Sequence, residues 1–310
     1  MEGRRGILRA AAVAAGMAGA LLALVPATAA AKPRAVIIFD RYITSSPVND
    51  NDIFSIRPGG SHENILVDTD YNDWGVAASP NGRLLAFSSD RDSDGNNEIF
   101  VQHPDGTHLH QRTHSPDAYS EWPSFTPDGK RILFDSDLKG SNNEIYTMRT
   151  DGSHLHPLTR GSNGSFDTVM SPDGKKIAFS RFIGTAGNLE IFRMRADGSH
   201  ERRLTHNPGR DELPSWYANS QKLAFESDRD GDDEIFTMQS DGSHQRRLTQ
   251  NDGVNDVEPA LSPNGKRIAF GRATPPGNEH IWVMDADGSH RHRVTSDPRS
   301  EEYPDWAKLR

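Results

Sequence analysis

The 310-residue sequence contains no cysteine, and hydrophobic residues make up only 34% of it. Without cysteine the chain has no disulfide framework, no thiol nucleophile, no thiolate metal ligand and no N-terminal cysteine for lipidation. The low apolar content disfavours both a membrane protein with several spans and a domain built around one large core. It favours many short, half-buried strands.

Positive charge is also in short supply. The chain has 35 Lys and Arg residues against 44 Asp and Glu residues, a formal net charge of −9. An acidic protein repels phosphate backbones, so nucleic acid is not an expected partner. Motifs for the common kinds of catalysis are missing as well: there is no G-x-S-x-G elbow, no H-E-x-x-H pair and no Walker-type glycine loop.

The first 31 residues are predicted to be an export signal. A positive segment with Arg4 and Arg5 precedes an apolar stretch over residues 10–25, and Pro26 comes just before Ala27-Thr28-Ala29, an A-x-A cleavage site. We expect cleavage to leave a mature periplasmic or extracellular protein, exported by either the Sec or the twin-arginine route. An uncleaved anchor is the alternative, although the apolar stretch is shorter than the roughly 20 residues that a span needs.

The rest of the chain is a repeat. The tetrapeptide D-G-S-H, or a close variant of it, recurs every 44–46 residues. Its histidines are His62, His108, His154, His200, His244 and His290. A second marker, [ST]-P-[DN]-G, stays in phase with the first at residues 79–82, 126–129, 171–174 and 262–265. Two markers in register indicate a repeat architecture.

Each unit predicts four strands. Between residues 164 and 205 the runs DTVM, KKIAFSR, EIFRMR and RRLT are separated by turns rich in Gly, Asp, Asn and Pro. Short runs with β-branched and aromatic residues between such turns indicate antiparallel hairpins. No helical pattern follows residue 31. Four strands in about 45 residues, apolar on both sides, are typical of a β-propeller blade.

The two ends of the repeat complement each other. Residues 35–39 match the second strand of a unit, whereas residues 303–306 match the first strand. Pairing of 301–308 with 35–67 would complete one blade and leave no open sheet edge. We therefore predict an all-β fold for residues 32–310: a single six-bladed β-propeller of four-stranded antiparallel blades, closed by pairing of the C-terminal strand with the N-terminal blade.

The same residues carry a family resemblance. The order P-x-W-x-P-D-G, K-x-I-A-F-x-S-D-R-D-G, E-I-F-x-M, D-G-S and R-R-L-T is similar to the TolB-like, WD40-like β-propeller repeat, most closely over residues 210–249. The resemblance covers residues 35–308 and concerns the propeller part of that family only. It implies a protein whose propeller face and channel bind partner proteins and peptides.

Carboxylates beside the innermost strands are the main candidate site. We expect them to surround one mouth of the central channel and to attract a cation, a basic peptide or another polar ligand. The alternative is that they accept hydrogen bonds from loop amides. The candidate ligand-binding residues are Asp73, Glu121, Asp167, Asp211, Asp256 and Glu301.

Two metal hypotheses were considered. Asp90, Asp92 and Asp94 form D-x-D-x-D-G, the first half of a calcium loop, although Val101 stands where such a loop has its bidentate Glu. Calcium is therefore an alternative to an ordinary turn, and no other cofactor is expected. The six repeat histidines belong to different blades and are too far apart for a shared zinc site.

The sequence thus predicts an exported propeller that binds an envelope or extracellular protein or peptide on its carboxylate-rich face, with no catalytic residues and no stable membrane span after signal cleavage. The alternative function is an enzyme, a hydrolase or lyase acting on a sugar or lactone with a metal at the channel mouth.

Overall fold

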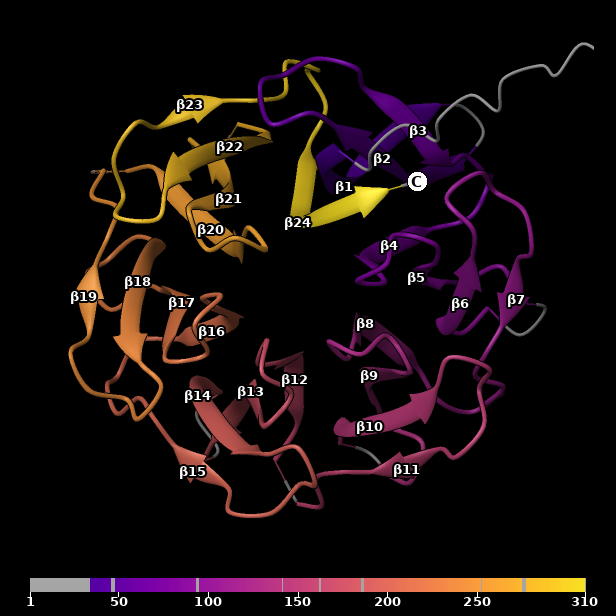
Figure 1. Ribbon diagram of the computed structural model, residues 1–310, viewed down its shortest axis with the longest axis horizontal. Helices are drawn as coiled ribbons and strands as arrows, with labels where there is room; N and C mark the ends of the chain where they lie inside the picture. Colours follow the sequence, from indigo (N-terminus) through magenta and orange to yellow (C-terminus); the bar gives the residue numbers. More distant parts are fainter. Residues whose placement is uncertain are drawn as a thin grey trace, which may run out of the picture. The chain divides into compact units, whose positions relative to one another are not determined.

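The computed structural model describes residues 34–309 except 46–47, 93–94, 141, 162, 185–186, 252 and 275–276. The predicted export signal lies outside the described residues. Within the described part the chain forms 24 strands and no helix, and hence no helix long and apolar enough to cross a membrane. The strands make six four-stranded antiparallel sheets arranged as a ring (Figure 1). The predicted all-β, six-bladed β-propeller is confirmed.

The blades are numbered along the chain, and their strands are given from the inside outward. Blade 1 contains β24 (Glu301–Leu309), β1 (Arg34–Ser45), β2 (Val48–Ile56) and β3 (Asn64–Val67). Blade 2 contains β4 (Asp73–Ala78), β5 (Leu85–Ser89), β6 (Glu98–Gln102) and β7 (His110–Gln111). Blade 3 contains β8 (Ser120–Phe125), β9 (Arg131–Ser136), β10 (Glu144–Arg149) and β11 (His156–Pro157).

Blades 4 to 6 repeat this order. Blade 4 contains β12 (Ser165–Met170), β13 (Lys176–Ile183), β14 (Asn188–Arg195) and β15 (Arg202–Arg203). Blade 5 contains β16 (Asp211–Trp216), β17 (Lys222–Ser227), β18 (Glu234–Gln239) and β19 (Arg246–Arg247). Blade 6 contains β20 (Asn255–Leu261), β21 (Arg267–Ala273), β22 (Glu279–Asp285) and β23 (His292–Arg293).

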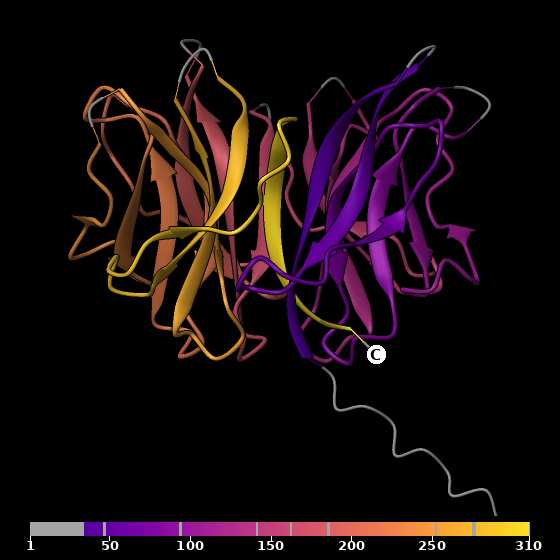
Figure 2. The same ribbon diagram turned by 90° about the horizontal axis from the view of Figure 1, so that it is seen from above.

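The strands run between two faces of the ring (Figure 2). We call the end at which the innermost strands begin the mouth face. The opposite end, at which they turn into the second strands, is the turn face, and it also carries the D-G-S-H turns that join the third and fourth strands. The six repeat histidines lie there, exposed and with φ between 53° and 59°.

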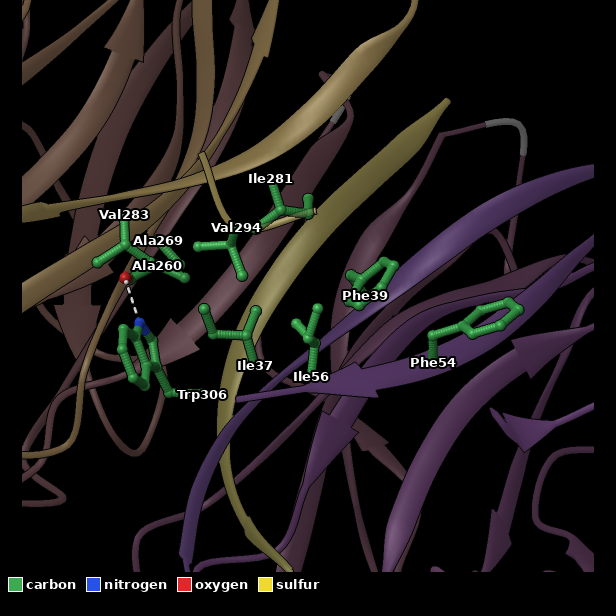
Figure 3. Close-up of a cluster of buried hydrophobic side chains, with 10 residues drawn as sticks. All are labelled: Ile37, Phe39, Phe54, Ile56, Ala260, Ala269, Ile281, Val283, Val294 and Trp306. Carbon is green, nitrogen blue, oxygen red and sulfur yellow. Dashed lines mark hydrogen bonds between the residues drawn. The ribbon is translucent and has the colours of Figure 1, made fainter. Parts of the chain in front are cut away.

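The ring closes as the sequence predicts. Strand β24 pairs with β1 from Arg34↔Leu309 to Arg41↔Glu301. Figure 3 shows the cluster that this closure buries: side chains of blade 1 pack against those of blade 6, and Trp306 Nε1 donates to the carbonyl of Ala260 at 3.0 Å. Closure therefore leaves β1 with partners on both sides and removes an open edge.

Apolar side chains cover both surfaces of each sheet. The second strand of every blade carries a fully buried phenylalanine, and the core clusters combine residues of adjacent blades. These residues are Phe39, Phe87, Phe134, Phe179, Phe225 and Phe270. Burying each contributes on the order of 1.5–3 kcal/mol, so a modest apolar content suffices when it is spread over six interfaces.

Candidate functional site

The innermost strands line a cavity of about 190 Å³ in the middle of the ring. Each strand contributes three consecutive residues to its wall. The segments are 75–77, 122–124, 167–169, 213–215, 258–260 and 303–305. The sixfold repeat thus builds one central site from all six blades.

A bulge in every innermost strand shapes this wall. In β4, for example, Trp74 pairs with Ser88 and Ala77 with Ala86, so β4 has one residue more than β5 over this stretch. We number the residues of the innermost strand motif from Asp73, Ser120, Ser165, Asp211, Asp256 and Glu301 in the six blades. The third residue of this motif has φ between 52° and 62°. These residues are Gly75, Trp122, Asp167, Leu213, Glu258 and Tyr303. Five are not glycine, and each stores on the order of 1–3 kcal/mol of backbone strain.

Side chains of the preceding blade hold the bulges in place. At four of the blade interfaces, the residue after the buried phenylalanine of the second strand accepts a hydrogen bond from the bulged amide. Gly75 N donates to Asp40 Oδ2 at 2.7 Å, and Glu258 N donates to Glu226 Oε2 at 3.0 Å. Ser88 and Ser180 accept from Trp122 and Leu213 in the same way. A repeated contact between blades therefore fixes the geometry of the cavity wall.

One side of the cavity is aromatic. The rings of Trp122 and Tyr303 lie 4.3 Å apart between centroids, although two blade steps separate their strands. They meet because Gly75, on the strand between them, has no side chain, and a Cβ there would lie 2.9 Å from the Trp122 ring.

The other side of the cavity is acidic. Asp167 and Glu258 flank Leu213 there. A third acid, Asp305, lies two residues after Tyr303 on β24, at a position where the other blades have Ala, Ser or Val. No lysine, arginine or histidine is among the described residues that line the cavity. Burial raises the pKa of Asp305 to about 6, and its carboxylate accepts a hydrogen bond from the Trp306 amide at 2.7 Å. Among the described residues, no cation lines the cavity to balance this carboxylate.

Further carboxylates stand beside the cavity. Glu258 and Glu279 share a hydrogen bond, and burial raises the pKa of both, that of Glu279 to about 8 with a further contribution from Glu302. Burial also raises the pKa of Glu212 to about 7, with Asp167 adding to the shift. The pKa values of Glu279 and Glu212 thus lie near neutral pH, and a cation entering the site would favour release of their protons.

The six acids singled out in the sequence do not occupy one structural position. Four are the first residue of the motif, and they are fully buried and paired with arginines that lie in the second strand or two residues after its end. The pairs are Asp73–Arg91 at 2.5 Å, Asp211–Arg229 at 2.7 Å, Asp256–Arg272 at 2.5 Å and Glu301–Arg41 at 2.5 Å. Glu121 is the second residue of the motif and accepts from Asn97. Asp167 is the third, and it alone of the six lines the cavity.

Arginines stacked on aromatic rings form a second repeated feature, and four of them are the partners of these acids. In five blades a guanidinium lies over two aromatic rings of the second and third strands, with its central carbon 4.2–5.5 Å from each centroid. The arginines are Arg41, Arg91, Arg181, Arg229 and Arg272. Blade 3 instead has Ser120 at the acid position and Leu138 in the place of Arg91 and Arg229.

The sequence argument missed Asp40, Asp135 and Glu226, which follow the buried phenylalanine of the second strand, and Asp305. A signal existed: a polar residue directly after the strand phenylalanine in every repeat except the one with Gly271.

The calcium hypothesis involves a loop that is only partly described, because Asp94 lies outside the described residues. Asp90 accepts hydrogen bonds from the Asn72 amide and side chain at 2.9 and 2.7 Å, and Asp92 accepts from Gln111. Within the described residues no group of three or more His, Asp or Glu is placed to hold a metal ion. Calcium at this loop stays a prediction.

A closed ring of six four-stranded blades around a central cavity defines the class as a β-propeller. The model of the TolB beta propeller domain matches residues 60–186 and 170–308, and the chain belongs to this family. None of the curated proteins matches the sequence.

Solved structures show the same fold. TolB from Acinetobacter baumannii is 20% identical with a TM-score of 0.74 over 88% of this chain, which spans 66% of the length of that protein. A putative TolB from Agrobacterium tumefaciens is 20% identical with a TM-score of 0.69, over 86% of this chain and 90% of that one. A chain in a nidogen/laminin complex is 12% identical with a TM-score of 0.69, over 88% and 98%.

Proposed function

We propose that this protein is an exported TolB-like β-propeller that binds a protein or peptide through its mouth face and central cavity. The observation that carries the proposal is the cavity itself, which combines the aromatic side chains of Trp122 and Tyr303 with the unbalanced carboxylate of Asp305. Such a wall suits a peptide segment that presents an apolar group beside a lysine or arginine.

Exposed aromatic side chains beside the mouth support a macromolecular ligand. Tyr71 and Tyr119 precede the innermost strands of two adjacent blades and are 46% and 48% exposed. Tyrosine is enriched in the centres of protein interfaces, because it contributes a large apolar area and a hydrogen bond at low entropic cost. A related propeller takes part in a nidogen/laminin complex, so this fold is compatible with binding a protein partner.

Export is part of the proposal and rests on residues 1–31. The mature chain should begin near Ala30 or Lys32, which N-terminal sequencing of the exported protein checks. Exported protein that still begins at Met1 would contradict cleavage. Replacing Arg4 and Arg5 with lysine should stop export only if the twin-arginine route is used.

Site-specific photo-cross-linking in the exporting cell tests the binding face. A photoreactive residue at Tyr119 should capture a discrete partner. The same residue at Leu155, which is 44% exposed in the same blade but beside a D-G-S-H turn, is the matched control. Adducts formed at Leu155 and none at Tyr119 would contradict a mouth-face interface.

The identified partner then allows a test of the chemistry. Association with the parent should slow as ionic strength rises, since charge steering is screened by salt. Asp305→Asn removes the unbalanced carboxylate and keeps its shape, so it should weaken binding and leave folding intact. Equal affinity of the parent and Asp305→Asn would show that the cavity carboxylate takes no part.

A further inference from the structure

Charge is distributed unevenly between the two faces. The acids described above gather at the mouth face and around the cavity. The beginnings of the second strands and the ends of the third strands, at the turn face, carry many of the lysines and arginines. A net acidic protein therefore presents a basic region on one side.

Cross-strand pairs at the turn face locate where this positive charge is uncompensated. The first residue of the second strand lies opposite the last residue of the third. In blade 6 this pair is Arg267↔Asp285, two opposite charges. In blade 4 it is Lys176↔Arg195, and in blade 3 it is Arg131↔Arg149. Like charges directly opposite each other destabilise a sheet, and an anion between them removes the penalty.

Blade 4 has a cavity at this place. It measures about 410 Å³ and is lined by Lys175, Lys176, Arg193, Met194, Arg195 and His200, which we call the blade 4 basic pocket. β13 and β14, which supply most of these residues, lie side by side in Figure 1. None of the described lining residues is acidic.

Neighbouring blade 5 fixes two of these cations. Lys176 Nζ donates to the carbonyl of Ser220 at 3.0 Å, and Arg193 Nη1 donates to the carbonyl of Ser240 at 2.9 Å. Carbonyl oxygens orient the two side chains but do not neutralise them. Lys175 and Arg195 are exposed and complete the pocket from the same blade. Two cations are thus pre-positioned and two can adjust to a ligand.

The acids of the two flanking turns, Asp173 and Asp197, attract Lys175, Lys176 and Arg195 electrostatically, but their hydrogen bonds are made within the turns. Asp173 Oδ1 accepts from Ser171 Oγ at 2.6 Å and from the Lys175 amide at 3.1 Å. Asp197 Oδ1 accepts from the Ser199 amide and hydroxyl at 2.9 and 2.7 Å. Both carboxylates stabilise their own turns, and neither lines the pocket.

Adjacent cavities at the turn face are of mixed charge. The one in blade 3 includes Asp128 and Asp151 beside its basic residues, and the one beside blade 5 includes Asp241. A long polyanion following the turn face would meet these acids. Among these three cavities of the described residues, the one in blade 4 alone has charged lining residues of a single sign, so it suits a compact anion.

We propose that the blade 4 basic pocket binds a phosphate monoester. Two lysines and two arginines, cationic at neutral pH, favour a ligand with more than one negative charge, and a tetrahedral dianion offers enough acceptors for donors arriving from both strands. This site is separate from the mouth-face site and does not depend on the function proposed for that face.

Calorimetric titration of the mature protein tests the proposal, with inorganic phosphate and glycerol phosphate as probes and with chloride and acetate at the same ionic strength for comparison. Phosphate should bind saturably, and the two monovalent anions should not. The double variant Lys175→Gln/Arg195→Gln changes only exposed side chains and should weaken phosphate binding by about tenfold or more. Saturable chloride or acetate binding of equal affinity, or no saturable phosphate binding, would overturn the proposal.

Lys266→Gln/Arg267→Gln is the control, because it removes the same number of positive charges from the turn face of blade 6, at the positions equivalent to Lys175 and Lys176. It should leave phosphate affinity within about twofold. An equal loss in both variants would mean that only the general charge of the face matters, and the proposal would fail. If the double variant does not fold, Arg195→Gln alone provides the same comparison against Arg267→Gln.

A further experiment distinguishes a lipid headgroup from a soluble phosphate monoester as the ligand. Vesicles of phosphatidylcholine with and without phosphatidic acid are compared with glycerol phosphate. Binding to the acidic vesicles that disappears in Lys175→Gln/Arg195→Gln assigns the site to a lipid headgroup. Binding of glycerol phosphate alone assigns it to a soluble ligand. Vesicle binding that the double variant retains would contradict the pocket as the phosphate site.

Discussion

The buried acids at the start of the innermost strands act through their arginines. In blade 5, Asp211 is fully buried, accepts from Arg229, and also accepts from Asn207. Arg229 in turn lies over Phe225 and Phe236. The ion pair therefore joins the innermost strand to the aromatic core of the same blade. This ion pair stabilises the packing of the strands within the blade. Other carboxylates line the central cavity.

Blade 3 shows how the pair can be replaced, and this leads to a prediction. Arg229→Leu should destabilise the protein by about 3–5 kcal/mol, because Asp211 would remain buried without its cation. The double variant Asp211→Ser/Arg229→Leu copies Ser120 and Leu138 of blade 3. It should recover most of that loss. Denaturant unfolding of both variants checks this, and a double variant no more stable than Arg229→Leu would contradict it.

Residue types were easier to predict from the sequence than residue positions. The repeat shows that acids recur beside each innermost strand, and all six are found there. However, Glu121 and Asp167 are shifted by one and two places from Asp73, because blades 3 and 4 have Ser120 and Ser165 at the first position. A shift of one place changes the side of the strand to which a side chain belongs, and spacing alone does not resolve it.

Strands and turns followed from local chemistry, whereas the bulges did not. The markers P-[DN]-G and D-G-S-H identify the turns of the unit correctly. The left-handed backbone at Trp122, Leu213 and Tyr303 has no local signal, since such large residues rarely adopt it. It is imposed by the neighbouring blade, whose side chains accept from the bulged amides.

Glycines of the P-[DN]-G turns provide a prediction at this scale. Gly82 and Gly174 occupy the same turn position in blades 2 and 4, with φ of 68° and 70°. Alanine at Gly174 meets no atom within 4 Å and should cost about 1–2 kcal/mol for the backbone conformation alone. Alanine at Gly82 would clash with the carbonyl of Lys308 in the closing strand, which should add about 1–3 kcal/mol.

Thermal unfolding of the two alanine variants measures the difference. The lower melting temperature should belong to Gly82→Ala, because only this variant disturbs the end of β24. Equal melting temperatures would show that the turn of blade 2 does not support ring closure.

The ring as a whole was predictable because its ends complement each other. Residues 35–39 lack an inner partner strand, and residues 303–306 are that strand. The polarity of the ring was not predictable from composition. A net charge of −9 does not indicate a turn face on which Lys176 lies opposite Arg195. The pairing of β13 with β14 brings these two residues together.

Carboxylates around the cavity make stability depend on pH, and this is the final prediction. The pKa of Glu279 rises from 4.5 to about 8 in the folded protein, and that of Glu212 to about 7. Between pH 4.5 and 8 the folded state therefore binds more protons than the unfolded state, so the free energy of unfolding should fall as pH rises, by about 1.4 kcal/mol per pH unit for each such proton.

Glu279→Gln should make this slope shallower. The control is Glu144→Gln, one residue after the position in blade 3 that is equivalent to Glu279; its carboxylate accepts from Thr159 and Gly161, and the variant should keep the slope. Urea unfolding at several pH values measures it, and a parent whose stability rises across this range would contradict protonated acids at the channel.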